Sequence, residues 1–256
     1  MIPLLEERVS ELEQMRRLPE RLYYIGDTTL LKRPKISIVG TRKPTPYTKH
    51  VTSELASRLS RAGVCIVSGA AMGVDAVAHQ SALAGGTIAV MGNGLDIRHP
   101  ATNRDLIGAI EARGLALSQF EPGFSATPWS FVVRNEIVTA LGELLIVAQA
   151  DLNSGSLRSA AFAEKMGKKI FVLPHRLGES RGTDMLVEQG KAEVIYDIDA
   201  FVGRFDDVAK AADDPFLRYC RSAPGYDEAV NRYGAKVYEY ELDGKIEVVL
   251  GKIRIR

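Results

Sequence analysis

The sequence predicts an α/β protein with a mostly parallel sheet covered by helices on both faces. Short apolar runs recur along the chain, and each is followed by a turn rich in glycine and other small residues. Amphipathic segments of helical length separate these runs, as expected of strand-helix-strand units with right-handed crossovers. The runs contain few polar residues, which is typical of strands buried on both faces. Because ligands collect at the carboxyl ends of such strands, the turns there are the first place to look for a site.

The predicted elements begin with a helix over Leu4–Leu18, based on a stripe of apolar residues that ends before Pro19. Two short extended pieces, Leu22–Ile25 and Leu30–Leu31, then lead into the first main strand. The predicted main strands are Ile36–Val39, Val64–Val67, Thr87–Val90, Leu115–Ser118, Leu144–Val147, Ile170–Leu173 and Glu193–Tyr196. The predicted helices between them are Tyr47–Ala62, Asp75–Ala84, Asn103–Arg113, Trp129–Leu141 and Leu157–Met166.

We therefore expect four parts: an N-terminal helix and lead-in segment (1–35), the sheet domain (36–205), an acidic linker (206–214) and a C-terminal domain (215–256). The predicted elements of the last part are helices Phe216–Ala223, Tyr226–Tyr233 and Ala235–Leu242 and a hairpin over Lys245–Arg256. Three helices and a hairpin suggest a winged-helix-like domain. Its third helix carries Glu239 and Glu241, which phosphates would repel, so we expect a structural or protein-binding tail with weak or no duplex binding.

Composition limits the partners and the compartment. The 256 residues include 33 Lys and Arg against 32 Asp and Glu, so the net charge is close to zero. Nucleic-acid binding would therefore depend on a local patch of basic residues and not on the net charge of the protein. Cys65 and Cys220 lie far apart and support no disulfide framework, which fits a reducing compartment. The sequence contains no apolar run of about 18 residues, the length of a membrane-spanning helix. We expect a soluble, cytoplasmic protein that does not insert into membranes.

The turn Gly40–Pro44 is the strongest candidate site. It follows the first main strand, carries Arg42 and Lys43, and leads into a helix whose first backbone N–H groups can bind an anion. Neither Asp nor Glu occurs from Thr28 to Ser53. These features are compatible with a solvated basic face or with a phosphate site.

The common nucleotide and hydrolase signatures are absent from the sequence. The turn at Gly40 lacks the further glycines of a dinucleotide-binding loop, and the turn at Gly69 lacks the Gly-Lys-Ser/Thr ending of a P-loop. Asp75 and His79 share a helix face and could act as acid and base or as metal ligands, but a third ligand is not evident. We therefore favour a structural role for this pair and expect neither metal nor cofactor. Trp129 and Phe131 are interpreted as core or interface residues and not as a base-stacking platform.

Six segments together resemble the DNA-processing protein A family, also called DprA or Smf. They are ISIVGTRKP (36–44), SGAAMGVDAVAH (68–79), TIAVMGNGLD (87–96), FVVRN (131–135), SGSLRSAAFA (154–163) and residues 172–174. The resemblance implies an extended Rossmann-type fold and a non-enzymatic function. It also implies binding of single-stranded DNA, formation of a homodimer, protection of incoming DNA and loading of a RecA-type recombinase during natural transformation.

Carried over to this sequence, the resemblance implies a strand-contacting turn at Gly40, Thr41 and Arg42, to which Lys43 adds charge. This turn would form the first wall of a binding pocket. The other implied site residues are Ser68, Gly69 and Gly73 in a second wall of the pocket, Arg134 and Asn135 in a third wall, Ser154, Gly155 and Ser156 at the start of a helix, and Arg104. The sequence departs from the family pattern at Glu136, where a second arginine is common, at Gln149, often Glu, and at His175, usually Gly.

An enzyme of another class is the alternative. Phosphoribohydrolases of the lysine-decarboxylase-like type also cradle a nucleoside monophosphate with small-residue turns, but their catalytic glutamate should fall near Ser154–Ala160. That window contains no carboxylate. The sequence therefore favours binding over catalysis.

Overall fold

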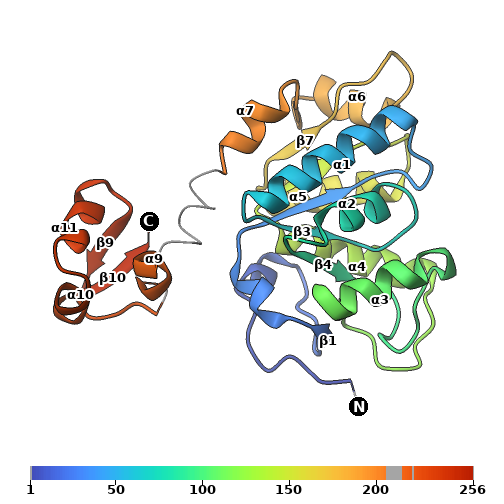
Figure 1. The fold of residues 1–256 in the computed structure, drawn as a ribbon. Helices are drawn as coiled ribbons and strands as arrows, with labels where there is room; N and C mark the ends of the chain where they lie inside the picture. Colours follow the sequence, from blue (N-terminus) through green and yellow to red (C-terminus); the bar gives the residue numbers. More distant parts are fainter. Residues whose placement is uncertain (1, 206–214, 221, 256) are drawn as a thin grey trace. The chain divides into compact units, whose positions relative to one another are not determined.

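A computed structural model of the chain describes residues 2–205, 215–220 and 222–255. The chain divides into two compact units, residues 1–205 and 206–256 (Figure 1). The predicted acidic linker at 206–214 lies outside the described residues.

The first unit is built on an eight-stranded sheet with the order β1-β5-β4-β3-β2-β6-β7-β8. The strands are β1 (Tyr23–Gly26), β2 (Lys35–Val39), β3 (Cys65–Ser68), β4 (Thr87–Val90), β5 (Leu115–Ser118), β6 (Leu144–Val147), β7 (Ile170–Val172) and β8 (Glu193–Val194). Every neighbouring pair is parallel except β1 with β5. The predicted mostly parallel α/β fold is confirmed.

Helices cover both faces because successive side chains of a strand point to opposite sides. They are α1 (Pro46–Arg61), α2 (Val74–Ala82), α3 (Arg104–Arg113), α4 (Pro128–Leu141), α5 (Gly155–Lys165), α6 (Arg181–Glu188) and α7 (Ile198–Gly203). Ile36 and Ile38 of β2 pack in the cluster that contains residues of α1, α2 and α7, whereas Val39 packs with residues of α4, α5 and α6. Helices α1 and α2 lie side by side (Figure 1). Each strand from β1 to β7 thus contributes to two apolar layers.

The N-terminal segment differs from the prediction. A helix was expected over Leu4–Leu18, but only Ser10–Gln14 forms a 3-10 helix, called η1. The reason is that the preceding residues pair with the sheet: Leu5 N donates to Leu22 O at 2.7 Å and Tyr24 N donates to Pro3 O at 3.1 Å. Backbone groups used in this way cannot form helical bonds.

The lead-in and the last part of the first unit show further differences. The pair Leu30–Leu31, expected to be extended, lies in a second 3-10 helix, η2 (Thr28–Lys32), whose N-cap Asp27 accepts from Thr29 N at 2.9 Å. Helices α6 and α7 were not predicted. They are short, and turn residues interrupt the sequence around them.

The second unit contains α9 (Pro215–Cys220), α10 (Tyr226–Tyr233), α11 (Ala235–Leu242) and the hairpin β9 (Ile246–Val249) and β10 (Lys252–Ile255). Phe216, Val237, Ile246 and Ile253 are among its buried core residues. Three helices and a hairpin occur where the sequence predicts them, and the winged-helix assignment stays a prediction. Among the residues described in both units, no helix has the length and apolar character needed to cross a membrane.

Candidate functional site

The turn after β2 is held closely against the start of α2. Thr41 O accepts from Val74 N at 3.2 Å, and Gly73 has a φ of +83°. A Cβ at Gly73 would lie 2.4 Å from Thr41 O, and one at Gly40 would lie 2.5 Å from a methyl group of Val74. Both glycines are therefore required for the close approach of two backbone segments. The approach leaves the side chains of Arg42 and Lys43 exposed on the turn.

The second predicted wall, Ser68–Gly73, is a support beneath the surface. The Ser68 hydroxyl is buried and donates to Ile38 O at 2.6 Å. Asp75 Oδ2 accepts from Gly69 N at 3.1 Å and from Ala71 N at 3.4 Å. The Ser68 hydroxyl and the N–H groups of Gly69 and Ala71 are therefore already engaged within the fold, so these groups support the site and are not offered to a ligand.

His79 supports the same wall from α2. Its Nε2 accepts from Ala70 N at 3.2 Å, and its Nδ1 lies 2.7 Å from Thr87 Oγ1. Burial, together with the charge of Arg134, lowers the pKa of His79 to about 3, so the ring is neutral. These contacts account for His79 as a structural residue. Among the described residues no cluster of three or more metal-ligating side chains occurs.

Arg134 of α4 is a nearly buried cation, with 4% of its surface exposed. Its Nη1 donates to Val90 O at 3.3 Å and lies 4.0 Å from Asp75 Oδ2, and its Nε has no hydrogen-bond partner among the described residues. A Cβ at Gly69 would lie 1.3 Å from Nη1, so only glycine leaves room for the guanidinium. Burial lowers the pKa of Arg134 and raises that of Asp75. Each ion is thus held at a desolvation cost.

Phe131 has two cations near its ring. The Cζ atoms of Arg42 and Arg134 each lie 5.8 Å from the centre of its ring, and the His99 ring centre lies 6.0 Å from it. Phe131 is half-buried. An aromatic face with guanidinium groups beside it can stack a base while the cations meet phosphate oxygens. The half-buried position is compatible with the interpretation of Phe131 as a core or interface residue, and the exposed Arg42 beside it makes base stacking an alternative.

Trp129, two residues earlier on α4, is not a core residue, because 63% of its surface is exposed. Its ring meets the edge of the Phe120 ring at a centroid distance of 6.0 Å, and Phe120 stacks on Phe124 at 4.4 Å. Trp129 and Phe131 are two residues apart on the helix and so do not share a face; Trp129 belongs to a separate aromatic group with Phe120 and Phe124.

The third predicted wall meets the start of α5. Asn135 Nδ2 donates to Gly155 O at 3.4 Å, and the N-cap Ser154 accepts from Leu157 N at 3.4 Å. Gly155 is exposed, whereas Ser156 is buried. The exposed backbone at the beginning of this helix is suited to an anion, and the Ser156 hydroxyl is not.

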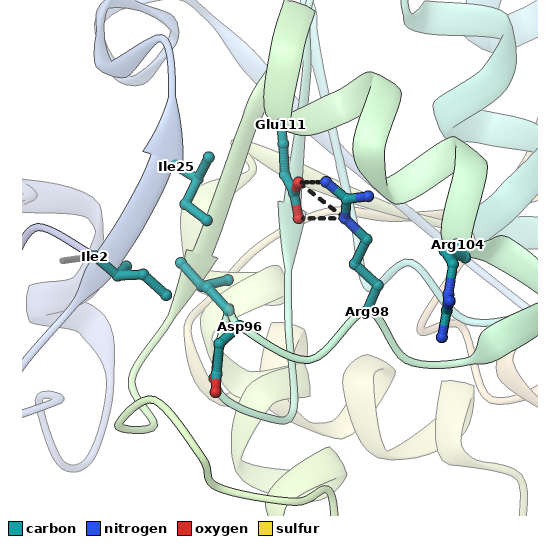
Figure 2. Close-up of a pocket in the computed structure, with 7 residues that line it drawn as sticks. Ile2, Ile25, Asp96, Arg98, Arg104 and Glu111 are labelled. Carbon is teal, nitrogen blue, oxygen red and sulfur yellow. Dashed lines mark hydrogen bonds and ion pairs between the residues drawn. The ribbon is translucent and has the colours of Figure 1, made fainter.

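Arg104 is exposed at the start of α3. It lines a pocket of about 460 Å³ whose other lining residues are Ile2, Ile25, Leu95, Asp96, Arg98 and Glu111. Figure 2 shows Arg98 and Glu111 turned toward one another, at 2.6 Å between Nη2 and Oε2, while Arg104 projects separately. Asn103 links this end of α3 to the second wall by donating to Ala70 O and Ala71 O, both at 3.0 Å.

Two of the residues that depart from the family pattern, Glu136 and Gln149, form hydrogen bonds to other segments of the chain. The carboxylate of Glu136 accepts from Arg16 N at 3.3 Å, so it is engaged by the N-terminal segment. Gln149 joins the turn after β2 to the loop before α6 through four hydrogen bonds. Phe131 and Gln149 are not among the predicted site residues, and the structure places both beside the turn that carries Arg42. For Phe131 the spacing was a usable signal, because residues three apart on a helix share a face and Phe131 precedes Arg134 by three.

Comparisons with known proteins agree with this fold. The sequence model of the family described as DNA recombination-mediator protein A matches residues 5–206. Protein Smf of Synechocystis sp. is 38% identical over 185 residues, covering 69% of this chain and 46% of that protein. The DNA processing protein DprA of Bacillus subtilis is 37% identical over 177 residues, covering 67% of this chain and 60% of that protein. The chain thus spans about half the length of the curated relatives it matches.

Among solved structures, one of DNA processing protein A from Helicobacter pylori concerns the single-stranded DNA binding mode of that protein. It is 43% identical in sequence, with a TM-score of 0.78, and the match covers 79% of this chain and 94% of that one. The residues matched by the family model, 5–206, include the whole sheet and the turns that form the candidate site.

Proposed function

This chain belongs to the DNA recombination-mediator protein A family, and on that premise we propose that it binds single-stranded DNA and does not act as an enzyme. The observation that carries the proposal is the Phe131 ring with the guanidinium groups of Arg42 and Arg134 beside it, each 5.8 Å from the ring centre. The Helicobacter pylori relative, whose structure concerns single-stranded DNA binding, supports the same assignment.

In the proposed complex, Arg42 and Lys43 neutralise phosphates while a base stacks on Phe131. The start of α5 offers exposed backbone to a further phosphate. Such contacts do not read the base edges, so we expect little sequence preference. Duplex DNA keeps its bases stacked inside, and Phe131 could not reach them. Single strands should therefore bind more tightly than duplex.

The charge balance within the site also favours an anion. Arg42 and Arg134 lie close enough that the charge of Arg42 contributes to lowering the pKa of Arg134, after the larger effect of burial. Asp75 is the buried carboxylate that faces Arg134, at 4.0 Å, and its Oδ2 is already shared with two backbone N–H groups. A phosphate beside the two arginines would supply the missing negative charge.

The family assignment further supports a role for this chain as a recombination mediator. We propose that it self-associates, coats and protects incoming single strands during natural transformation, and delivers them to a RecA-type recombinase in the cytoplasm. A homodimer would present two such sites to one strand. Simultaneous binding of both sites would raise the affinity for longer oligonucleotides without any new contact.

The experiment is fluorescence anisotropy of labelled oligo-dT, with a labelled duplex as comparison, for the wild type and for Arg42→Ala over a range of salt concentrations. Each phosphate contact contributes about 0.7 to the slope of log affinity against log salt for a single strand. Arg42→Ala should weaken binding and lower the slope by about that amount. Arg61→Ala is the matched control, because Arg61 is exposed at the far end of α1 and its loss changes the net charge equally.

Equal affinity for duplex and single strands, or equal slopes for Arg42→Ala and Arg61→Ala, would contradict the proposed site. If the wild type binds neither kind of DNA at moderate salt, the proposed function itself is wrong.

A further inference from the structure

Gln149 lies at the carboxyl end of β6, and only 8% of its surface is exposed. Its side-chain oxygen accepts from Thr45 N and from Thr48 Oγ1, both at 3.0 Å. Its side-chain nitrogen donates to Glu179 O at 3.2 Å, and its backbone oxygen accepts from Thr41 N at 2.8 Å. Because Thr45 N–H can only donate and Glu179 O can only accept, these partners determine the orientation of the amide.

Two of these bonds hold the ends of the same short loop. Thr41 is bound by the backbone of Gln149 and Thr45 by its side chain, and the residues between them include Arg42 and Lys43. The other side of the loop packs against the start of α2, where Val74 N donates to Thr41 O. The loop that carries both exposed cations is therefore held from two sides, and one of them is Gln149.

The choice of an amide determines which partners this position can satisfy. A glutamate, which is common here in the family, could accept from Thr45 and Thr48 but could not donate to Glu179 O. A neutral side chain that both accepts and donates meets all the hydrogen-bonding requirements of this position without adding charge.

We infer that Gln149 is a positioning residue for the DNA site, holding the Arg42–Lys43 loop in its binding conformation through its bonds to Thr41 and Thr45. The inference about DNA rests on the proposed function. The inference about the loop rests on the hydrogen bonds alone, so the two can be tested separately.

The first measurement is amide hydrogen exchange in peptides that span residues 41–48 of the DNA-free protein. Gln149→Ala removes the acceptor of Thr45 N and Thr48 Oγ1, and exchange at this end of the loop should become faster. Gln149→Glu retains acceptor oxygens and should preserve most of the protection. Gln80→Ala, an exposed glutamine on α2, is the matched control and should leave exchange unchanged.

The second measurement is oligo-dT affinity for the same variants. Gln149→Ala should bind about tenfold more weakly, the effect of roughly one hydrogen bond, with the salt slope of the wild type, because every cation is still present. Gln149→Glu, which keeps the acceptor of Thr45 N and Thr48 Oγ1, should retain most of the wild-type affinity. Affinity that is lost in Gln149→Ala and retained in Gln149→Glu, in parallel with loop protection, would link DNA binding to this acceptor.

Unchanged exchange in Gln149→Ala would overturn the positioning role, whatever the DNA result. Faster exchange with unchanged affinity would overturn the link to DNA. A wild-type protein that binds no DNA would refute the proposed function, while the exchange data would still decide whether Gln149 holds the loop.

Discussion

Removing either charge of the buried pair Asp75–Arg134 should destabilise the first unit, and removing both should cost less than the sum of the two single changes. The two side chains are nearly buried, and their charged atoms lie 4.0 Å apart. At that separation two unit charges attract by about 4 kcal/mol if the effective dielectric constant is about 20. A single substitution leaves the remaining ion buried without its counter-charge, which typically costs about 3–5 kcal/mol.

The variants are Asp75→Asn, Arg134→Met and the double substitution. Asp75→Asn keeps an oxygen that can accept from Gly69 N and Ala71 N, so it isolates the charge. The double variant has neither ion. Because burial raises the pKa of Asp75 and lowers that of Arg134, both desolvation costs are relieved in it. We expect the double variant to be about 4 kcal/mol more stable than additivity predicts.

The assay is urea unfolding at neutral pH followed by the fluorescence of Trp129. This is the only tryptophan in the sequence, and it lies in the first unit on the same helix as Arg134, so the signal reports that unit alone. Additive free energies in the double variant would refute the reasoning, because they would mean that the two charges do not interact across 4.0 Å.

Three further predictions concern other parts of the first unit. Gly69→Ala should weaken oligo-dT binding in anisotropy titrations, because the new Cβ would lie 1.3 Å from Nη1 of Arg134 and the guanidinium would have to move; unchanged affinity would exclude Arg134 from the site. Lys168 is partly buried and donates to two backbone carbonyls at 2.5 Å, and burial lowers its pKa to about 8, so folding releases its proton. Stability should therefore rise as pH increases from about 8 toward the ordinary lysine pKa of about 10.4, and urea midpoints of Lys168→Met should lack this part of the rise. Burial raises the pKa of the Cys65 thiol to about 12, so iodoacetamide should modify it only at the rate of unfolding, and rapid labelling in the native protein would contradict its burial.

The main strands and most of the helices could be predicted because their signals are local. The strand at Ile36–Val39 is an apolar run before a glycine turn, and β2 covers Lys35–Val39 in the structure. The helix predicted over Trp129–Leu141 begins one residue earlier, at Pro128, where Thr127 provides the N-cap. Helix caps, turns and apolar periodicity depend on residues that are close together in the sequence, so these elements can be predicted without knowing the fold.

The N-terminal segment shows the limit of that approach. Its apolar spacing suits a helix, but Leu5 and Tyr24 form backbone bonds that join residues far apart in the sequence. Leu12 and Met15 are buried in the main core without a long helix to carry them. A spacing pattern predicts which side chains are buried, and tertiary pairing decides the backbone conformation that buries them.

For the candidate site, the sequence alone determined the basic turn at Gly40–Lys43, its place at the carboxyl edge of a parallel sheet and the resemblance that points to single-stranded DNA. Only the tertiary structure decided that Ser68 and Gly69 support the site from within, that Phe131 lies beside two arginines and that Gln149 bonds to the loop. These relations join the turns after β2 and β3, helix α4 and the loop after β6, and burial and hydrogen bonding between distant segments become determinate only when the chain is packed.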